Sequence, residues 1–298
     1  MNPLETHHLS KKFRNVEAVE DLTLTIPEGA VFALVGPNGA GKTTTIKTLM
    51  NIYRPTAGRA EVLGADSRKL GPKELAQIGY VSENQHMPDW MPVGYFLSYC
   101  KPFYPTWDDS LAAALIRQHE LPLDRKLKAL SRGMRIKAAL VSSLAYRPRL
   151  IVLDEPFSGL DALVRDELIE TVLEMAHEAT VLLASHDLAE IESFASHIGY
   201  LEQGRLRFTE DMNSLSERFR EVEVTLDSPA ELPREWPSHW LNPEQASVVV
   251  RFTDSAFHRD TSETEIQARF SGVRSVTARS MPLRSIFVAL AKSGRKAG

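Results

Sequence analysis

Cysteine, long apolar runs and excess positive charge are all scarce in this sequence. The single cysteine, Cys100, excludes an internal disulfide and suits a reducing cytosol. No run approaches the roughly twenty apolar residues of a membrane span, and the first residues lack a signal-peptide pattern. We therefore expect that, if the protein works at a membrane, another chain supplies the crossing.

The charge balance disfavours nucleic acid as a partner. The 298 residues carry a net charge of −4, from 35 basic and 39 acidic side chains, so no global positive field recruits a polyanion. The short basic stretch at residues 132–137 is better explained as a solvated helix face. With 43% apolar residues, the chain can bury a full core and is predicted to form one large domain and one smaller domain.

One stretch, residues 36–43, fits the phosphate-binding pattern G-x-x-x-x-G-K-[ST]. The apolar run before it predicts a buried strand over residues 31–35, and residues 44–50 predict a helix after it. Its glycines let successive N–H groups face one anion at a helix N-terminus. The candidate nucleotide-binding residues here are Gly36, Pro37, Asn38, Gly39, Ala40, Gly41, Lys42, Thr43 and Thr44. Lys42 would reach the β- and γ-phosphates and the Thr43 hydroxyl would hold Mg²⁺; the alternative is a glycine-rich turn without a ligand.

Polar side chains follow three further apolar runs. Residues 78–81 predict a buried strand, after which Glu83 can reach a metal beside the phosphate loop. Residues 150–153 resemble a parallel strand buried on both faces, and end in Asp154 and Glu155. Asp154 would bind Mg²⁺ and Glu155 would act as general base, unless the two form an acidic pair on a surface turn. After the strand predicted at 180–184, His186 can donate to a γ-phosphate or serve a structural role.

A second helix terminus is suited to anions. Ser131 is a natural N-cap for the helix predicted at residues 135–145, and Gly133 exposes backbone N–H groups. Helix caps of this kind are common, so this motif alone is a weak indication of an anion-binding site. Strands that alternate with helices from residue 31 to 201 predict an α/β fold.

Aromatic residues leave two questions open. Phe13 lies between strands predicted at residues 5–9 and 21–26, and either stacks on a nucleobase, worth about 1–3 kcal/mol, or packs in the fold. Residues 88–107 form either the inner face of a helical subdomain or an outward groove for a partner. Their aromatic residues are Trp90, Tyr95, Phe96, Tyr99, Phe103, Tyr104 and Trp107.

The pattern changes near residue 214. Strands are predicted at 221–226, 247–252 and 273–280, with a closing helix at 283–292 and a linker rich in proline and tryptophan at 228–243. These elements predict a small α+β module that holds no catalytic constellation, and is regulatory, dimerising or partner-binding.

Taken together, residues 4–212 resemble the ATP-binding subunit of ABC transporters. The resemblance implies a P-loop NTPase fold, an ABC ATPase domain at 1–213 with an inserted helical subdomain at 86–147, and an accessory domain at 214–298. In the family's terms, the matching parts are the Walker A loop at 36–43, the Walker B pair Asp154 and Glu155, the D-loop at 158–161 with Asp161, the switch histidine His186, the signature at 130–134 and the aromatic A-loop position at Phe13.

The resemblance also implies ligands, partners and location. It implies ATP and Mg²⁺ as ligands, with Ser131 and Gly133 of one subunit touching the nucleotide of a second subunit in a head-to-tail dimer, for which a homodimer is permitted. Membrane-spanning subunits are the other implied partners, so that the chain would be cytoplasmic and peripheral on the inner face of the cell membrane. The C-terminal module resembles that of bacterial drug- and acetoin-utilisation-type export ATPases, which implies export.

Three positions depart from the family pattern. Arg132 and Met134 replace a glycine and a glutamine of the signature, and Glu83 replaces the usual glutamine of the Q-loop. A carboxylate at 83 still suits Mg²⁺, but adds negative charge near ATP, which we expect to slow nucleotide-driven closure.

The sequence disfavours two other classes of function. An ABC-type ATPase that acts on ribosomes or DNA usually has a second cassette or a long coiled coil, whereas this sequence has one Walker A motif and no sustained heptads between Lys42 and Ser131. A module that only binds nucleotide would not need Glu155.

Overall fold

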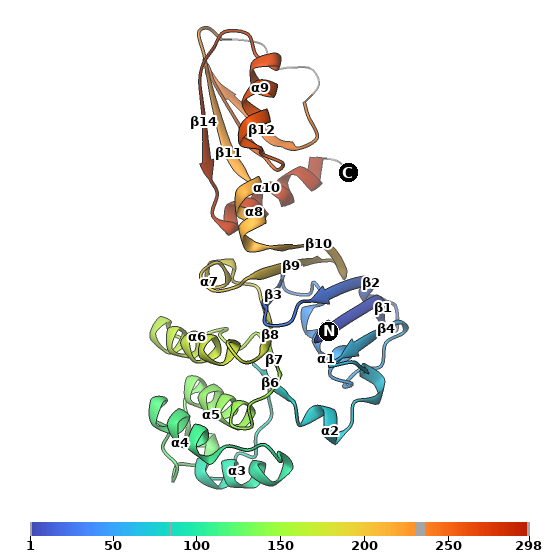
Figure 1. The fold of residues 1–298 in the computed structure, drawn as a ribbon, viewed down its shortest axis with the longest axis vertical. Coiled ribbons are helices and arrows are strands. Elements are labelled where there is room, and N and C mark those ends of the chain that lie inside the picture. Colours follow the sequence, from blue (N-terminus) through green and yellow to red (C-terminus); the bar gives the residue numbers. More distant parts are fainter. Residues whose placement is uncertain (1, 84, 230–235, 297–298) are drawn as a thin grey trace. The chain divides into compact units, whose positions relative to one another are not determined.

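The computed structural model describes every residue except 1, 84, 230–235 and 297–298 (Figure 1). The chain divides into two compact units. The first consists of Met1–Asp187 and Phe194–Thr209, and the second of Leu188–Ser193 and Glu210–Gly298. Among the described residues, no helix is both long enough and apolar enough to cross a membrane.

The first unit is built on a six-stranded sheet with the order β10-β9-β3-β8-β7-β6. Its strands are β3 (Val31–Val35), β6 (Ile78–Ser82), β7 (Leu150–Asp154), β8 (Thr180–Ser185), β9 (His197–Glu202) and β10 (Arg205–Asp211). Strands β9, β3, β8, β7 and β6 pair in parallel, and every residue of β3, β7 and β8 is buried. The α/β fold and these apolar strands were predicted correctly, whereas β10 was missed.

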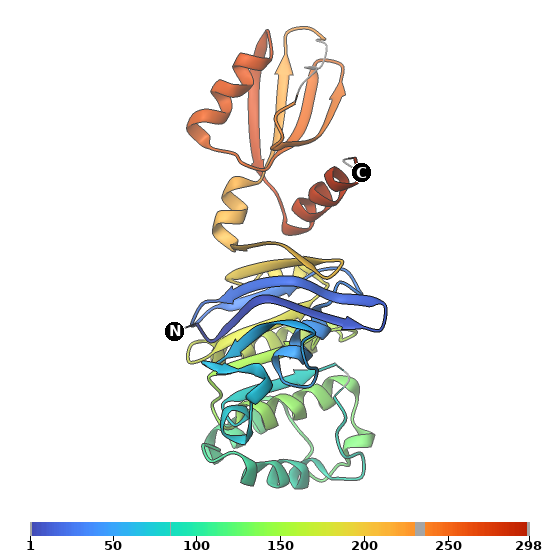
Figure 2. The same ribbon diagram turned by 90° about the vertical axis from the view of Figure 1, so that its right-hand side faces the viewer.

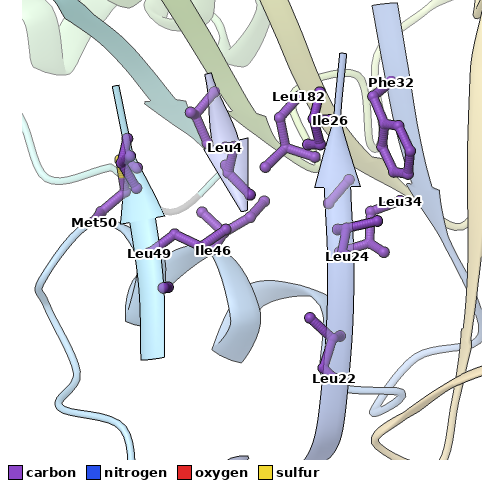
Figure 3. Close-up of a cluster of buried hydrophobic side chains, with 14 of the residues drawn as sticks. Leu4, Leu22, Leu24, Ile26, Phe32, Leu34, Ile46, Leu49, Met50 and Leu182 are labelled. Carbon is purple, nitrogen blue, oxygen red and sulfur yellow. The ribbon is translucent and has the colours of Figure 1, made fainter. Parts of the chain in front are cut away.

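A second, antiparallel sheet packs over the first. It has the order β2-β1-β4-β5 and consists of β1 (Leu4–Phe13), β2 (Val16–Ile26), β4 (Ala57–Val62) and β5 (Ala65–Asp66). Helix α1 (Lys42–Leu49) lies between the two sheets, where Ile46 and Leu49 meet Leu24, Phe32 and Leu182 in one buried cluster (Figure 3). This packing fixes the start of α1, and with it the turn at 36–43.

Helices α5 and α6 cover the other side of the six-stranded sheet (Figure 1). The helical elements of this unit are η1 (Ser67–Lys69), α2 (Pro72–Leu75), α3 (Val93–Cys100), η2 (Lys101–Phe103), α4 (Asp109–Gln118), η3 (Leu127–Ala129), α5 (Arg132–Leu144) and α6 (Ala162–Ala176). Helix α5 begins earlier than predicted because Ser131 caps it, accepting from the Met134 N–H at 3.3 Å. Asp161 caps α6 in the same way. A Cβ on Gly133 would lie 2.9 Å from Val164, so the starts of α5 and α6 are in close contact.

The aromatic segment at 88–107 is divided between the core and the surface. Phe96 is buried, and Tyr104 stacks on the buried Tyr146 with ring centroids 3.8 Å apart. Other rings face outward, and more than half of the side-chain surface is exposed at Trp90, Tyr95, Tyr99 and Phe103. The exposed rings form two pairs: Trp90, in the turn before α3, pairs with Tyr95 of α3, and Tyr99 of α3 pairs with Phe103 of η2.

The second unit is a four-stranded antiparallel sheet with the order β12-β13-β11-β14, beside which α9 runs (Figure 2). Its elements are α7 (Leu188–Glu192), α8 (Met212–Arg218), β11 (Arg220–Leu226), β12 (Trp240–Ala246), β13 (Val249–Asp254), α9 (Arg259–Arg269), β14 (Val273–Ser280) and α10 (Leu283–Lys296). The linker predicted at 228–243 is wrong from residue 240 onward, where β12 begins. Its residues 230–235 lie outside the described part of the chain.

Trp240 is the centre of the second unit's core. It is 3% exposed and stacks on Phe252 and Phe270, with centroids 4.4 Å and 6.1 Å away. We predict that Trp240→Ala lowers the stability of this unit by about 3–5 kcal/mol, the cost of removing a large core side chain. Urea unfolding measures the change. The exposed Trp90→Ala is the control and should stay within about 0.5 kcal/mol; equal losses for the two variants would contradict the assignment.

Candidate active site

The turn between β3 and α1 forms a backbone cradle. Gly39 and Gly41 have φ angles of +82° and +107°, values at which side chains are strained. A Cβ on Gly41 would also lie 2.3 Å from the Ala18 carbonyl oxygen. Glycine is therefore required at position 41 both by backbone conformation and by the close approach of β2.

We predict that Gly41→Ala damages this cradle. The clash with Ala18 adds to the backbone strain, and together they should lower stability by about 1–3 kcal/mol and weaken nucleotide binding. Denaturant unfolding and nucleotide titration give the two readouts. Gly29→Ala is the matched control, because Gly29 has φ +73° but nothing within 4 Å of its added Cβ. It should show only the smaller backbone cost, with nucleotide binding intact.

Lys42 opens α1 with its ammonium group held at the turn. The side chain is only 5% exposed, and its Nζ donates to the carbonyl oxygens of Gly36 at 2.7 Å and Pro37 at 3.2 Å. The same Nζ lies 3.1 Å from Glu155 Oε1. A buried ammonium held by carbonyl groups is placed to stabilise the negative charge of a phosphate group in the cradle.

The carboxyl ends of β6, β7 and β8 bring the other polar groups to the same edge of the sheet. Thr43 Oγ1 donates to Asp154 Oδ1 at 2.8 Å, and His186 Nδ1 lies 2.7 Å from Glu155 Oε2. The Glu83 N–H donates to the Asp154 carbonyl oxygen at 3.0 Å. Ligands of open α/β sheets bind at this edge, so the sequence-based prediction that these residues converge is confirmed by the geometry.

The two carboxylates after β7 have different environments. Burial raises the pKa of Asp154, against the hydrogen bond from Thr43, which lowers it. Glu155 adopts φ +53°, an uncommon angle for a side chain other than glycine. Its N–H donates to the Ala184 carbonyl oxygen, and its two carboxylate oxygens face Lys42 and His186. This strained turn fixes Glu155 at the opening of the site.

A cavity of about 430 Å³ opens at this edge. It is lined by Ala18, Asn38, Gly39, Ala40, Gly41, Lys42, Thr43, Thr44, Glu83, Glu155, Ser158 and His186. A second cavity of about 250 Å³ lies on the other side of Thr43 and is lined by Lys47, Tyr80, Glu83, Asp154 and neighbouring residues. The sequence analysis did not select Ala18, whose small side chain has no chemical signal.

Apart from Gly36 and Pro37, which begin the turn, four predicted nucleotide-binding residues do not line either cavity. Phe13 is 39% exposed and meets the edge of Tyr53, with centroids 5.2 Å apart. Ser131, Gly133 and Asp161 stand at the starts of α5 and α6. The structure thus gathers the phosphate and carboxylate residues but leaves these four apart within one chain.

The residues at the cavity fit a nucleotide with magnesium. Glycine amides and a buried lysine suit a triphosphate, while Thr43, Glu83 and Asp154 offer the oxygen donors that Mg²⁺ prefers. Among the described residues no cluster of three or more His, Cys, Asp or Glu side chains is arranged to hold a metal ion on its own. That is compatible with Mg²⁺, which in such sites is bound by one or two protein groups together with substrate phosphates.

This fold and site define a P-loop ATPase domain. A family model described as ABC transporter matches residues 19–158. The ABC transporter ATP-binding protein YtrB of Bacillus subtilis is 31% identical over 231 residues, which cover 77% of this chain and 79% of YtrB. The chain therefore belongs to the ABC transporter ATP-binding proteins, and hydrolysis of ATP is its activity.

Two further comparisons agree with this assignment, and a third shows the same fold. The Fe(3+) ions import ATP-binding protein FbpC of Pseudomonas fluorescens is 36% identical over 220 residues, covering 69% of this chain and 60% of FbpC. A solved structure of an ATP-binding subunit of an ABC transporter is 27% identical with a TM-score of 0.66, over 72% of this chain and 92% of that one. The ATP-binding cassette MJ0796, in a dimeric post-hydrolysis state with ADP and phosphate, is 21% identical over 70% of this chain and 98% of its own length; its TM-score of 0.63 shows the shared fold.

Proposed function

We propose that the chain hydrolyses ATP as one half of a head-to-tail dimer that drives separate membrane-spanning subunits. The convergence of Lys42, Glu155 and His186 on one cavity is the observation that carries the catalytic part of the proposal, and Asp154 lines the second cavity, which shares Glu155 with the first. Lys42 would stabilise the phosphates, His186 would hold the γ-phosphate, and Glu155 would orient and deprotonate the attacking water. Mg²⁺, held through Thr43, Asp154 and Glu83, would neutralise charge that develops on the phosphates.

A head-to-tail dimer would account for three of the predicted residues that lie outside the cavity. Ser131, Gly133 and Asp161 present capped helix starts and would reach the nucleotide of the partner subunit. Phe13 would meet the base of its own nucleotide from the end of β1. Mixing the chain with Mg²⁺ and ATP under conditions that slow hydrolysis should convert monomer to dimer in light scattering. A chain that hydrolyses ATP with Mg²⁺ but stays monomeric throughout would contradict this part.

The exposed aromatic pairs support docking to a membrane subunit. Trp90 with Tyr95, and Tyr99 with Phe103, form two exposed aromatic pairs at and just before α3 and η2, and aromatic residues are enriched at protein interfaces. We predict that Tyr99→Ala with Phe103→Ala reduces co-purification with the membrane subunit at least about tenfold, because hot-spot residues are each worth about 2 kcal/mol or more. The ATPase rate of the isolated chain should not change. Retained co-purification would remove this pair from the interface.

Location, direction and domain limits follow from the same proposal. The chain would be cytoplasmic and peripheral on the inner face of the cell membrane, with residues 1–213 hydrolysing ATP, the subdomain 86–147 docking, and 214–298 accessory. Export stays a prediction, since FbpC, a relative, is named for import of Fe(3+). Isolation of the chain with a membrane protein, rather than with ribosomes or DNA, separates the transporter from the soluble alternatives.

A further inference from the structure

The two charged departures from the family pattern contact each other. Arg132, the first residue of α5, donates through Nη2 to Glu83 Oε1, 49 residues earlier in the chain. Both side chains are partly exposed, at 46% and 29%. A Cβ on Gly159 would lie 3.2 Å from Arg132 Nη1. The guanidinium thus bridges the loop after β6 and the turn after β7, the two segments that carry Glu83 and Glu155.

Glu83 is exposed to both cavities of the site. It lines the larger cavity together with Lys42 and the smaller one together with Asp154. Three carboxylates therefore surround a place that suits a triphosphate. Two of them have partners within the site, since Lys42 lies beside Glu155 and Thr43 donates to Asp154. The third carboxylate, that of Glu83, is paired with Arg132. Arg132 lines neither cavity, so this partner comes from outside the site.

Electrostatics gives this ion pair a role in nucleotide binding. Without a partner, the Glu83 carboxylate would repel a polyanionic nucleotide until a cation arrived. When Mg²⁺ enters with ATP, the same carboxylate is an attractive oxygen donor, and Arg132 must then share it or release it. The effect of either charge therefore depends on the presence of the other and on the metal.

We propose that Arg132 is a positioning residue for Glu83. Arg132 neutralises the Glu83 carboxylate in the metal-free site and releases it to Mg²⁺ when the nucleotide binds. This inference rests on the Mg²⁺–nucleotide site of the proposed function. It makes the substitutions at 83 and 132 one functional pair, in which each charge compensates for the other. It also links the metal side of the site to the start of α5.

Equilibrium binding of a fluorescent ADP analogue to the full chain, in EDTA and across a Mg²⁺ titration, tests the pair without relying on hydrolysis. In EDTA, Arg132→Gln should weaken binding about two- to fivefold and Glu83→Gln should strengthen it by a similar factor, the range for partly exposed ion pairs. In the double variant, Arg132→Gln should change the affinity of Glu83→Gln by less than about twofold, because no carboxylate then remains for Arg132 to neutralise. Arg132→Gln should also lower the Mg²⁺ concentration needed for half-maximal binding, and Glu83→Gln should raise it.

Two control variants separate a functional pair from general damage. Arg132→Lys keeps the charge and should retain most of the metal-free affinity. Arg135→Gln, whose original side chain donates to Asp89 at 2.8 Å, removes a neighbouring ion pair on α5 and should change neither readout. If the effects of the single variants at 83 and 132 multiply independently, or the Mg²⁺ requirement is the same in Arg132→Gln, the inference is wrong. If the unsubstituted chain binds no nucleotide under any condition, the proposed function fails as well.

Discussion

Replacing Glu155 by glutamine is expected to leave nucleotide binding intact and to lower ATP turnover about 10²–10⁴-fold, the usual contribution of a positioned general base. Gln has nearly the same shape, but it cannot accept the proton of the attacking water. The carboxylate lies at the cavity between Lys42 and His186, and only these two contacts change character in the variant. Steady-state phosphate release and equilibrium nucleotide binding measure the two properties separately.

A distant glutamate provides the control for this variant. Glu178 is 64% exposed and pairs with Arg147 at 3.0 Å, away from the cavity. Glu178→Gln should leave turnover within about twofold, as expected when an exposed ion pair is lost. Turnover unaffected in Glu155→Gln would take the general-base role away from this residue, while loss of nucleotide binding would assign it to binding instead.

Replacing Lys42 by alanine should have the second large effect, on binding as well as on turnover. The variant removes the buried positive charge of the cradle and also leaves Glu155, 3.1 Å from Lys42 Nζ, without its cation. Both changes make the binding of a negatively charged triphosphate less favourable. We expect kcat to fall about 10²–10³-fold, as when one preorganised donor to a transition state is removed, and nucleotide affinity to fall too.

Two further substitutions define what the Lys42 result means. Lys101→Ala removes an exposed lysine that pairs with Asp109 on the surface, and it should leave both properties unchanged. Lys42→Ala with Glu155→Gln removes both members of the pair. It should recover part of the lost nucleotide affinity, because no unpaired carboxylate then remains beside Lys42's position. Recovery of turnover in the double variant is not expected; if it occurred, Glu155 would not be the base.

The central features of the site were predictable because they depend on local sequence. A short apolar run such as residues 150–153, which ends in two carboxylates, favours a buried strand, and the parallel arrangement then brings Asp154 to the same edge as Thr43. The glycines and Lys42 of the turn form a contiguous pattern, which one stretch of sequence reveals. The alternation of these runs with helices was sufficient for the fold class.

The features that were missed depend on contacts between distant residues. Strand β12 contains Pro243, which argues against a strand until β12 is found to be an edge strand of its sheet. Helix α9 is mostly polar and buries few side chains, Ile266 among them, so its apolar periodicity is weak. The pairing of Arg132 with Glu83 spans 49 residues, and no local pattern indicates it.

The close approach of Gly133 to Val164 has a mechanical consequence. A Cβ at position 133 would lie 2.9 Å from Val164, so α5 and α6 are closely packed where they begin. A shift of Ser131, the cap of α5, toward α6 would therefore press directly on the first turn of the helix that Asp161 caps. In the proposed dimer, a nucleotide that displaced one of these caps would also displace the other.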